Sequence, residues 1–168
     1  LLIRGIEIEI GKKHIVILNC DKEAENIKSF KDVASYKKRK PDVLILAPHP
    51  FVFSPKSLKS SFLENIGLFD AVEMTVFSNI IFNFNKRAEA IAKKYGKPFI
   101  ATSDTHFLKD INRGYALINV KEKTIEEVLN AIKNGDFQNK INSMSPFAMA
   151  KYRIKGVLNT IRPNTFRS

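Results

Sequence analysis

The chain has 168 residues, of which 44% are hydrophobic and 27% are charged, and its formal net charge is +11. This composition predicts a globular domain and excludes a membrane-spanning protein, because no apolar stretch reaches the roughly 18 residues that a spanning helix needs. The single cysteine, Cys20, cannot form an internal disulfide, so we expect a cytoplasmic protein without a thiolate metal cluster.

The positive charge is concentrated in two segments. Residues 37–40 form a basic run, and residues 138–168 contain no acidic residue. Such a field attracts polyanions, which favours a nucleic acid or a phosphorylated substrate over a neutral one. A charged surface that only solvates the chain has the same composition, so the charge leaves both interpretations open.

The first half of the chain shows strand and helix patterns in alternation. Residues 6–10 alternate between apolar and acidic side chains, which is typical of a strand with one buried face, and residues 14–18 form a second apolar run after a glycine turn. Asp21 is a candidate cap for a helix that ends before Pro41. The continuous apolar run at 43–47 predicts a strand that is covered on both faces.

The same alternation continues in the middle of the chain. Ser54 and Pro55 have the residue types that begin a helix, and residues 71–76 form a strand pattern. Residues 83–95 carry the apolar stripe of an amphipathic helix, which we expect Gly96 to end.

Two further strands and a helix complete the pattern. The strands are expected at 98–101 and 115–120, and the helix is expected to begin at Thr124 and end at Gly135. Strands that alternate with helices along the chain predict an α/β fold.

Polar side chains follow two of the predicted buried strands. Asp104 and His106 come after the strand at 98–101, and two residues apart on extended backbone they point the same way. His49 follows the strand at 43–47. Because ligands bind at the carboxyl ends of parallel strands, we expect these side chains to reach one centre.

The predicted amino-terminal hairpin adds further candidates. Glu7 and Glu9 lie on the polar face of its first strand, and His14 begins its second. A lone histidine is most often a surface residue or a hydrogen-bonded core residue. All three histidines of this sequence lie beside a strand end, which favours a shared metal site. Imidazole and carboxylate ligands suit manganese, iron or zinc.

The sequence resembles the polymerase and histidinol phosphatase (PHP) domain from about Ile3 to Phe137. The resemblance rests on segments in the order and approximate spacing of that family: GIEIEI, HIVILN, APHPF, DAVEMTVFSN, IAKKYGKPFIATSDTH and INRGYALI. It implies a distorted TIM-like (β/α)7 barrel that holds two or three divalent metal ions (Mn, Zn or Fe) and hydrolyses phosphate esters. It also implies five metal ligands, of which the first and the last two act in catalysis: Glu7, His14, His49, Asp104 and His106.

Three further residues have expected roles near this site. Glu73 and Asn79 resemble the Glu-x-x-Asn region of the family and are expected to support the ligands. Arg113 has the forked guanidinium that binds a phosphate oxygen pair, although a surface arginine without a role fits equally well. One departure from the family is Ile17, which stands where the family usually has glycine.

A larger departure concerns the amino terminus. The His-x-His segment of the family's first strand and the histidine after its second strand have no counterpart, and the sequence begins at Leu1. We interpret this as a missing amino-terminal piece, so that the first strands of the barrel are absent. The exposed strand edges would then pair with that segment or with another chain. We expect the shortened chain to hydrolyse its substrate weakly or not at all.

The expected organisation is therefore a PHP-like metal-binding barrel at 1–137, followed by a basic extension at 138–168 with an amphipathic helix that begins at Ser145 and Pro146. The sequence leaves two roles open for that helix: it packs on the barrel, or it binds a nucleic acid or a partner.

Two functions fit these observations. The first is a metal-dependent phosphoesterase that acts on a nucleotide, an oligonucleotide or a small phosphorylated metabolite such as histidinol phosphate. The second is a non-catalytic RNA-binding or scaffold protein on a PHP-like fold, as in archaeal ribonuclease P. Five convergent metal-binding side chains favour the enzyme, because a scaffold has no use for them.

Overall fold

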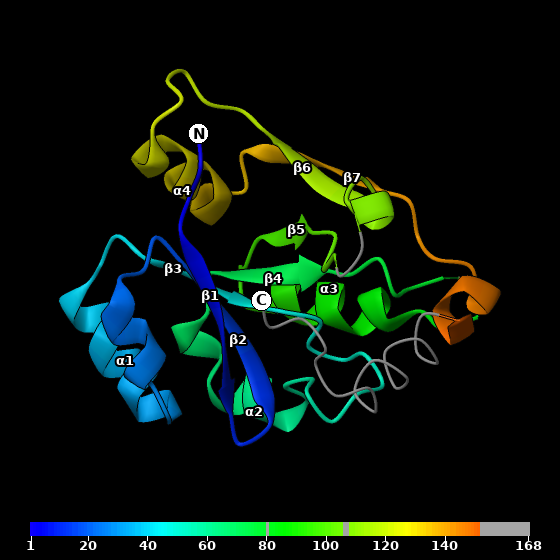
Figure 1. The fold of residues 1–168 in the computed structure, drawn as a ribbon, viewed down its shortest axis with the longest axis horizontal. Helices are drawn as coiled ribbons and strands as arrows, with labels where there is room; N and C mark the ends of the chain where they lie inside the picture. The colour runs from blue at the N-terminus through cyan, green and yellow to red at the C-terminus, as the bar shows by residue number, and fades with distance from the viewer. Residues whose placement is uncertain (80, 106–107, 152–168) are drawn as a thin grey trace, which may run out of the picture.

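The computed structural model describes residues 1–79, 81–105 and 108–151, without the side chain of Lys109 (Figure 1). The strands in this part of the chain are β1 (Gly5–Ile10), β2 (Lys13–Leu18), β3 (Leu44–Ala47), β4 (Ala71–Met74), β5 (Phe99–Ala101), β6 (Gly114–Ile118) and β7 (Phe137–Ile141). The α-helices are α1 (Phe30–Arg39), α2 (Ser60–Glu64), α3 (Phe84–Lys94) and α4 (Ile125–Asn134), and short 3-10 helices are η1 (Lys22–Asn26), η2 (Ile66–Leu68) and η3 (Leu108–Asp110).

The expected distorted TIM-like (β/α)7 barrel is wrong. The strands form a five-stranded sheet in the order β1-β2-β3-β4-β5 and a separate two-stranded sheet of β6 and β7. Only β3, β4 and β5 run parallel, whereas β1, β2 and β3 pair antiparallel. The repeated strand-helix-strand unit that builds a barrel is thus present only from β3 to β5, and in the described residues both sheets are open.

A two-residue turn explains why β1 and β2 pair antiparallel. Gly11 and Lys12 both have positive φ angles, +54° and +68°, as the tight hairpin turn of type I′ requires. This turn fixes the register, so that Glu9 lies opposite His14 and Glu7 lies opposite Val16. Glu7 and His14 are therefore diagonal neighbours on one face of the hairpin.

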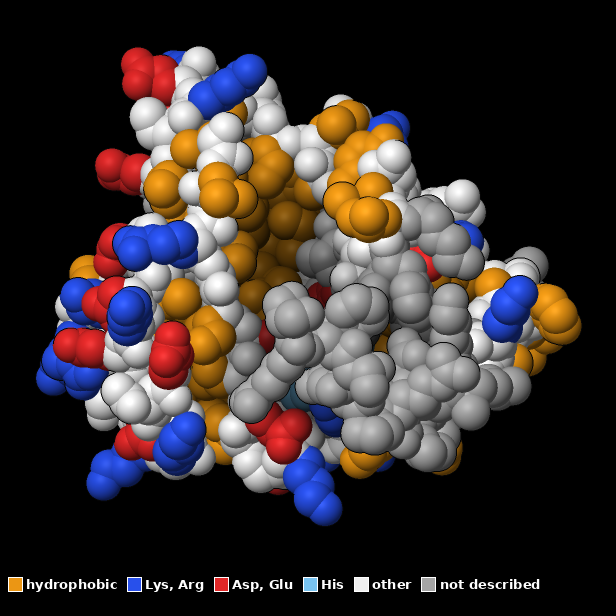
Figure 2. Space-filling model, in the orientation of Figure 1, with side chains coloured by type: hydrophobic (Ala, Val, Ile, Leu, Met, Phe, Trp, Pro, Cys, Tyr) orange, Lys and Arg blue, Asp and Glu red, His pale blue; other side chains and the backbone are white. Residues whose placement is uncertain are grey.

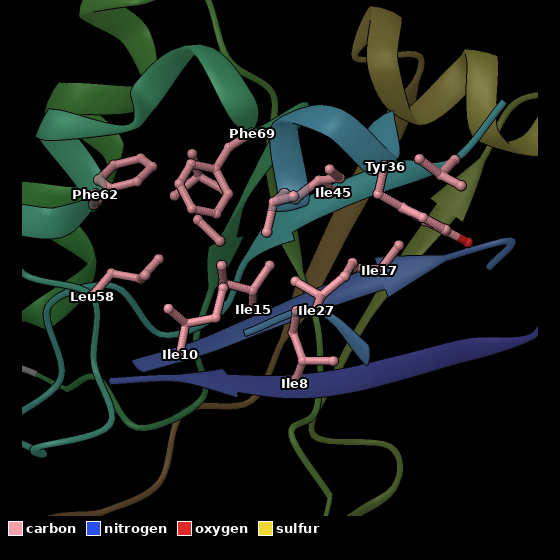
Figure 3. Close-up of a cluster of buried hydrophobic side chains, with 14 of the residues drawn as sticks. Ile8, Ile10, Ile15, Ile17, Ile27, Tyr36, Ile45, Leu58, Phe62 and Phe69 are labelled. Atoms are coloured by element: carbon pink, nitrogen blue, oxygen red, sulfur yellow. The ribbon is translucent and has the colours of Figure 1, made fainter. Parts of the chain in front are cut away.

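The largest hydrophobic core lies between the main sheet and the helices α1, α2 and α3. Ile15 and Ile17 of β2 are fully buried in it, together with Phe62 and Phe69 (Figure 3). The alternation that predicted the first two strands is confirmed, because the inward isoleucines are buried while Glu7 and Glu9 on the other face are exposed.

The opposite face of the main sheet is covered only in part. Leu44, Leu46 and Ile100 of this face pack against Leu129 and Ile132 of α4. Figure 2 shows a hollow lined by hydrophobic side chains next to α4. The sheet residues Leu44, Leu46 and Ile100 are themselves buried.

Two expected helix starts differ from the observed ones. Asp21 caps the short helix η1, and Ser29 begins α1 with a reciprocal pair of hydrogen bonds to Asp32. Ser54 begins no helix, because its hydroxyl oxygen accepts a hydrogen bond from the amide of Lys56 two residues on and forms a local turn. The next helix, α2, begins only at Ser60.

The expected carboxyl-terminal helix is seen in part. Residues 146–151 are helical, and the hydroxyl oxygen of Ser145 accepts a hydrogen bond from the amide of Ala148. The rest of the expected helix lies outside the described residues. Among the described helices, none has the length and apolar character to cross a bilayer.

One side chain joins the second sheet to the free edge of β5. The amide of Asn139 in β7 accepts a hydrogen bond from Ala101 N (2.7 Å) and donates one to Phe99 O (2.8 Å). The Asn139 amide group thus occupies the place of a neighbouring strand.

Replacing Asn139 with leucine is therefore expected to lower the free energy of unfolding by about 1–3 kcal/mol, because the β5 backbone groups lose their partners. Urea denaturation measures this. Gln138→Leu is the matched control, since Gln138 is an exposed amide on the same strand. An equal loss of stability in both variants would contradict the role of Asn139.

Candidate metal centre

Three of the expected ligands meet at the β1–β2 hairpin and the end of β3. One ligand atom each from Glu7, His14 and His49 can be chosen so that all lie within 4.8 Å of one another. Oε1 of Glu7 lies 2.8 Å from Nδ1 of His14 and 3.8 Å from Nε2 of His49. The two imidazole rings are 5.5 Å apart between their centroids.

The donor set fits a divalent metal ion. Nδ1 of His14 and Nδ1 of His49 are buried and make no well-aligned hydrogen bond, although buried polar atoms nearly always have a partner. Two imidazoles and a carboxylate are ligands that zinc, iron and manganese accept. Ligand atoms about 2.1 Å from one zinc ion lie at most about 4.2 Å apart, so the side chains would draw together slightly on binding.

The surroundings of the cluster favour a negative charge on Glu7 and a positive charge on His49. The interaction with His49 and the charge of His14 hold the pKa of Glu7 below its usual value, although partial burial opposes this. Burial lowers the pKa of His49, but Glu7, Glu73 and Asp104 outweigh it and raise that pKa overall. The surroundings are therefore negative, which also suits a bound cation.

Glu73 of β4 supports the backbone of His49. The Glu73 side chain is 2% exposed and accepts hydrogen bonds from the His49 backbone amide and from the Thr102 hydroxyl. Burial raises the pKa of Glu73, and the charge of Asp104 raises it further. One carboxylate thus connects the segments that follow β3 and β5.

Both segments carry backbone strain. His49 has a φ angle of +29° and Asp104 one of +41°, in the region that side-chain-bearing residues rarely adopt. Such conformations persist only where the surroundings enforce them, and they are common at functional sites. The hydrogen bonds to Glu73 are one part of that enforcement.

The other two expected ligands have different outcomes. The charge of Asp104 acts on both His49 and Glu73, so Asp104 lies near them, but it is not part of the three-residue cluster. His106 lies outside the described residues. Asn79 serves a structural role, since its side chain binds the backbone of Ile81, Phe82 and Met144.

Thr102 has no counterpart in the sequence-based expectations. It lies directly after β5 and two residues before Asp104. Because Asp104 has a positive φ angle, the alternation of an extended strand does not apply there, and no pattern in the sequence indicated the role of Thr102.

Gly114, the first residue of β6, allows close packing against Thr102. A Cβ atom at this position would lie 2.3 Å from the Thr102 carbonyl oxygen and 2.9 Å from Val76 Cγ1. Gly114→Ala is expected to displace Thr102, destabilise the fold by about 1–3 kcal/mol and weaken zinc binding.

Thermal unfolding and zinc titration of the Gly114→Ala variant test this. Gly67→Ala is the control, because a Cβ atom there meets nothing within 4 Å. Unchanged zinc affinity in Gly114→Ala would show that Thr102 does not contribute to the site.

Arg113 is already paired. Its Nε atom lies 2.7 Å from Oδ1 of the buried Asp110, and its side chain is 31% exposed. The guanidinium therefore has only part of its surface available for a phosphate.

Most side chains of the basic run at 37–40 form ion pairs with acidic neighbours. Lys37 contacts Asp70 at 2.7 Å, and Lys40 contacts Asp21 at 2.8 Å. Arg39 lies 3.4 Å from Glu23. These pairs offset three of the four positive charges of the run locally.

One family profile matches part of the chain. Residues 82–137 match the profile of a family described as PHP-associated. A search of curated proteins gave no match.

Two solved structures share the fold. One is a two-domain protein from Bacteroides vulgatus, described as containing a PHP-like metal-dependent phosphoesterase, with a TM-score of 0.63 and 20% identity. The other is PsfC from Pseudomonas syringae, with a TM-score of 0.66 and 15% identity. The alignments cover 84% and 92% of this chain, but only 45% and 65% of those proteins.

Proposed function

Because the chain is related to the PHP family, we propose that it is a metal-dependent phosphoesterase that hydrolyses a nucleotide, an oligonucleotide or a small phosphorylated metabolite. The observation that carries this proposal is the cluster of Glu7, His14 and His49, in which the buried Nδ1 of His14 faces the Glu7 carboxylate at 2.8 Å and the buried Nδ1 of His49 has no hydrogen-bond partner among the described residues. A scaffold protein gains nothing from such a cluster.

A divalent ion of manganese, zinc or iron would be held by Glu7, His14 and His49, with Asp104 beside them. The proposal includes one or two further divalent ions. When bound, such ions activate water and neutralise the charge of a phosphate ester. Glu73 would orient the backbone of His49 for this task, and the Thr102 hydroxyl would hold Glu73 in place.

Lysines near the cluster favour an anionic substrate. Nζ of Lys56 lies 3.9 Å from Oε2 of Glu9, and that carboxylate lies 3.7 Å from Nε2 of His14. Lys13 reaches the carbonyl oxygens of Pro55 and Ser57 at the same end of the hairpin. These positive charges attract a phosphate toward the ligands.

The experiment that tests the proposal is hydrolysis of p-nitrophenyl phosphate and bis(p-nitrophenyl) phosphate in the presence of manganese, zinc or iron. We expect weak hydrolysis that a chelator abolishes and added metal restores. The preferred ester distinguishes a phosphatase from a nuclease. Hydrolysis that persists in chelator would contradict the proposal.

Further polypeptide is proposed to cover the open sheet, either an amino-terminal segment or another chain. In the described residues β1 pairs only with β2, and the hollow beside α4 is lined by apolar side chains (Figure 2). Open edges and apolar surfaces of this kind are normally paired or covered. The single free cysteine is compatible with a reducing cytoplasm, where we place the protein.

A further inference from the structure

A pocket lies at the same end of the sheet as the cluster. It has a volume of about 460 Å³, within the range of small-molecule sites. Half of its lining side chains are phenylalanines, and the full lining is Val52, Phe53, Phe77, Phe82, Phe84, Pro146, Met149 and Ala150.

Two walls of the pocket come from the segments that follow β3 and β4. Val52 N donates a hydrogen bond to the carbonyl oxygen of His49 (3.2 Å), so a single turn separates this wall from a candidate ligand. Phe77 follows Glu73 by four residues, a distance of at most about 14 Å along the chain. The pocket is therefore within the reach of one small molecule bound at the cluster.

The third wall is the helical turn at 146–151, which lies beside the loop before α3 (Figure 1). Met144 N donates a hydrogen bond to Val76 O (2.9 Å), and the Asn79 side-chain amide donates one to Met144 O (3.1 Å). These bonds hold the turn next to Phe77.

The rings form a platform for a flat ligand. Phe82 and Phe84 are nearly parallel, with an angle of 10° between rings whose centroids are 6.2 Å apart. Phe82 is 50% exposed, so part of its ring is open to solvent. Nζ of Lys59 lies 5.9 Å from the Phe53 ring centroid and adds a positive charge.

We propose that this pocket binds the base of a nucleotide whose phosphate lies at the metal centre. The inference rests on the proposed function and narrows its substrate class to nucleotides and oligonucleotides. Open aromatic faces stack on any nucleobase, and the nearby lysine suits the attached phosphate. An apolar chain would also fill the volume, but a pair of parallel rings, with a lysine at another phenylalanine of the same pocket, matches a planar heterocycle with a negative charge better.

The test is calorimetric binding of 5′-AMP and ribose 5-phosphate to the whole chain in a chelating buffer, where no hydrolysis occurs. We expect 5′-AMP to bind at least about fivefold more tightly, since stacking of one base contributes a factor of about 5 to 150. Phe82→Ala is expected to remove most of this difference, and Phe82→Tyr is expected to retain it.

Phe147→Ala is the matched control, because Phe147 is 80% exposed on the same helical turn and does not line the pocket. Circular dichroism verifies that each variant is folded. Equal binding of the two ligands, or unchanged 5′-AMP binding in Phe82→Ala, would overturn the inference.

Failure of the inference can be separated from failure of the proposed function. Metal-dependent cleavage of p-nitrophenyl phosphate without preferential binding of 5′-AMP would support the phosphoesterase proposal and contradict the base pocket. Preferential binding of 5′-AMP without metal-dependent cleavage would support a nucleotide-binding pocket and contradict the phosphoesterase proposal.

Discussion

Replacing His49 with alanine is expected to lower the affinity for zinc or manganese by at least about 100-fold, because even residues that only orient a ligand contribute about 10- to 100-fold. His49 is one of three side chains in the cluster, and its backbone is held by Glu73. Competition titration with a chromophoric chelator measures the affinity.

Glu9→Gln is the matched control for this prediction. Glu9 lies on the same face of β1 and 3.7 Å from His14, but it is not in the three-residue cluster. We expect this variant to bind metal nearly as well as the unmodified chain. A similar loss in both variants would indicate that general negative charge, rather than the cluster, attracts the ion.

Replacing Glu73 with alanine is expected to reduce the free energy of unfolding by about 2–4 kcal/mol and to weaken metal binding. The change removes the acceptor for the His49 amide and the Thr102 hydroxyl, and each buried donor left unpaired costs about 1–3 kcal/mol. Urea denaturation and metal titration give the two effects separately.

Glu73→Gln separates the hydrogen bonds from the charge. The glutamine oxygen still accepts from the His49 amide, and the Thr102 hydroxyl can turn to accept from the glutamine amide. We expect this variant to recover most of the stability and metal affinity. If it were as defective as Glu73→Ala, the negative charge of Glu73 would be the essential feature.

Local patterns in the sequence predicted most of the elements. Strict alternation predicted β1, and glycines with positive φ angles end α3 and α4 where expected. Thr124 caps α4 through a hydrogen bond from Glu127 N, as its spacing from Glu127 indicates. β7 was missed, because the sequence FQNKI has few apolar residues and its pairing with β6 is the main evidence for a strand.

The arrangement of the strands in the sheet could not be predicted from local sequence patterns. The barrel came from the family resemblance, whereas the open sheet depends on which distant strands pair. The turn at Gly11 and Lys12 is a local signal for antiparallel pairing, and it argued against a purely parallel barrel. The pairing of β2 with β3 joins segments separated by α1 and has no local signature.

Part of the candidate site followed from the strand-end rule. That rule predicted that His49 would converge with Asp104 and His106, whereas Glu7 and His14 were added from the hairpin pattern and the family resemblance; the structure brings Glu7, His14 and His49 together. Thr102 and the link from Glu73 to His49 depend on side-chain geometry between separate strands, which spacing along the chain does not show.

The central claim is that Glu7, His14 and His49 bind a divalent metal ion. Anomalous scattering from crystals grown with zinc or manganese tests it most directly, since the signal locates the ion and identifies its ligands. We predict a peak about 2.0–2.2 Å from ligand atoms of these three side chains. A structure in which saturating metal leaves this position empty, or binds only elsewhere, would contradict the account.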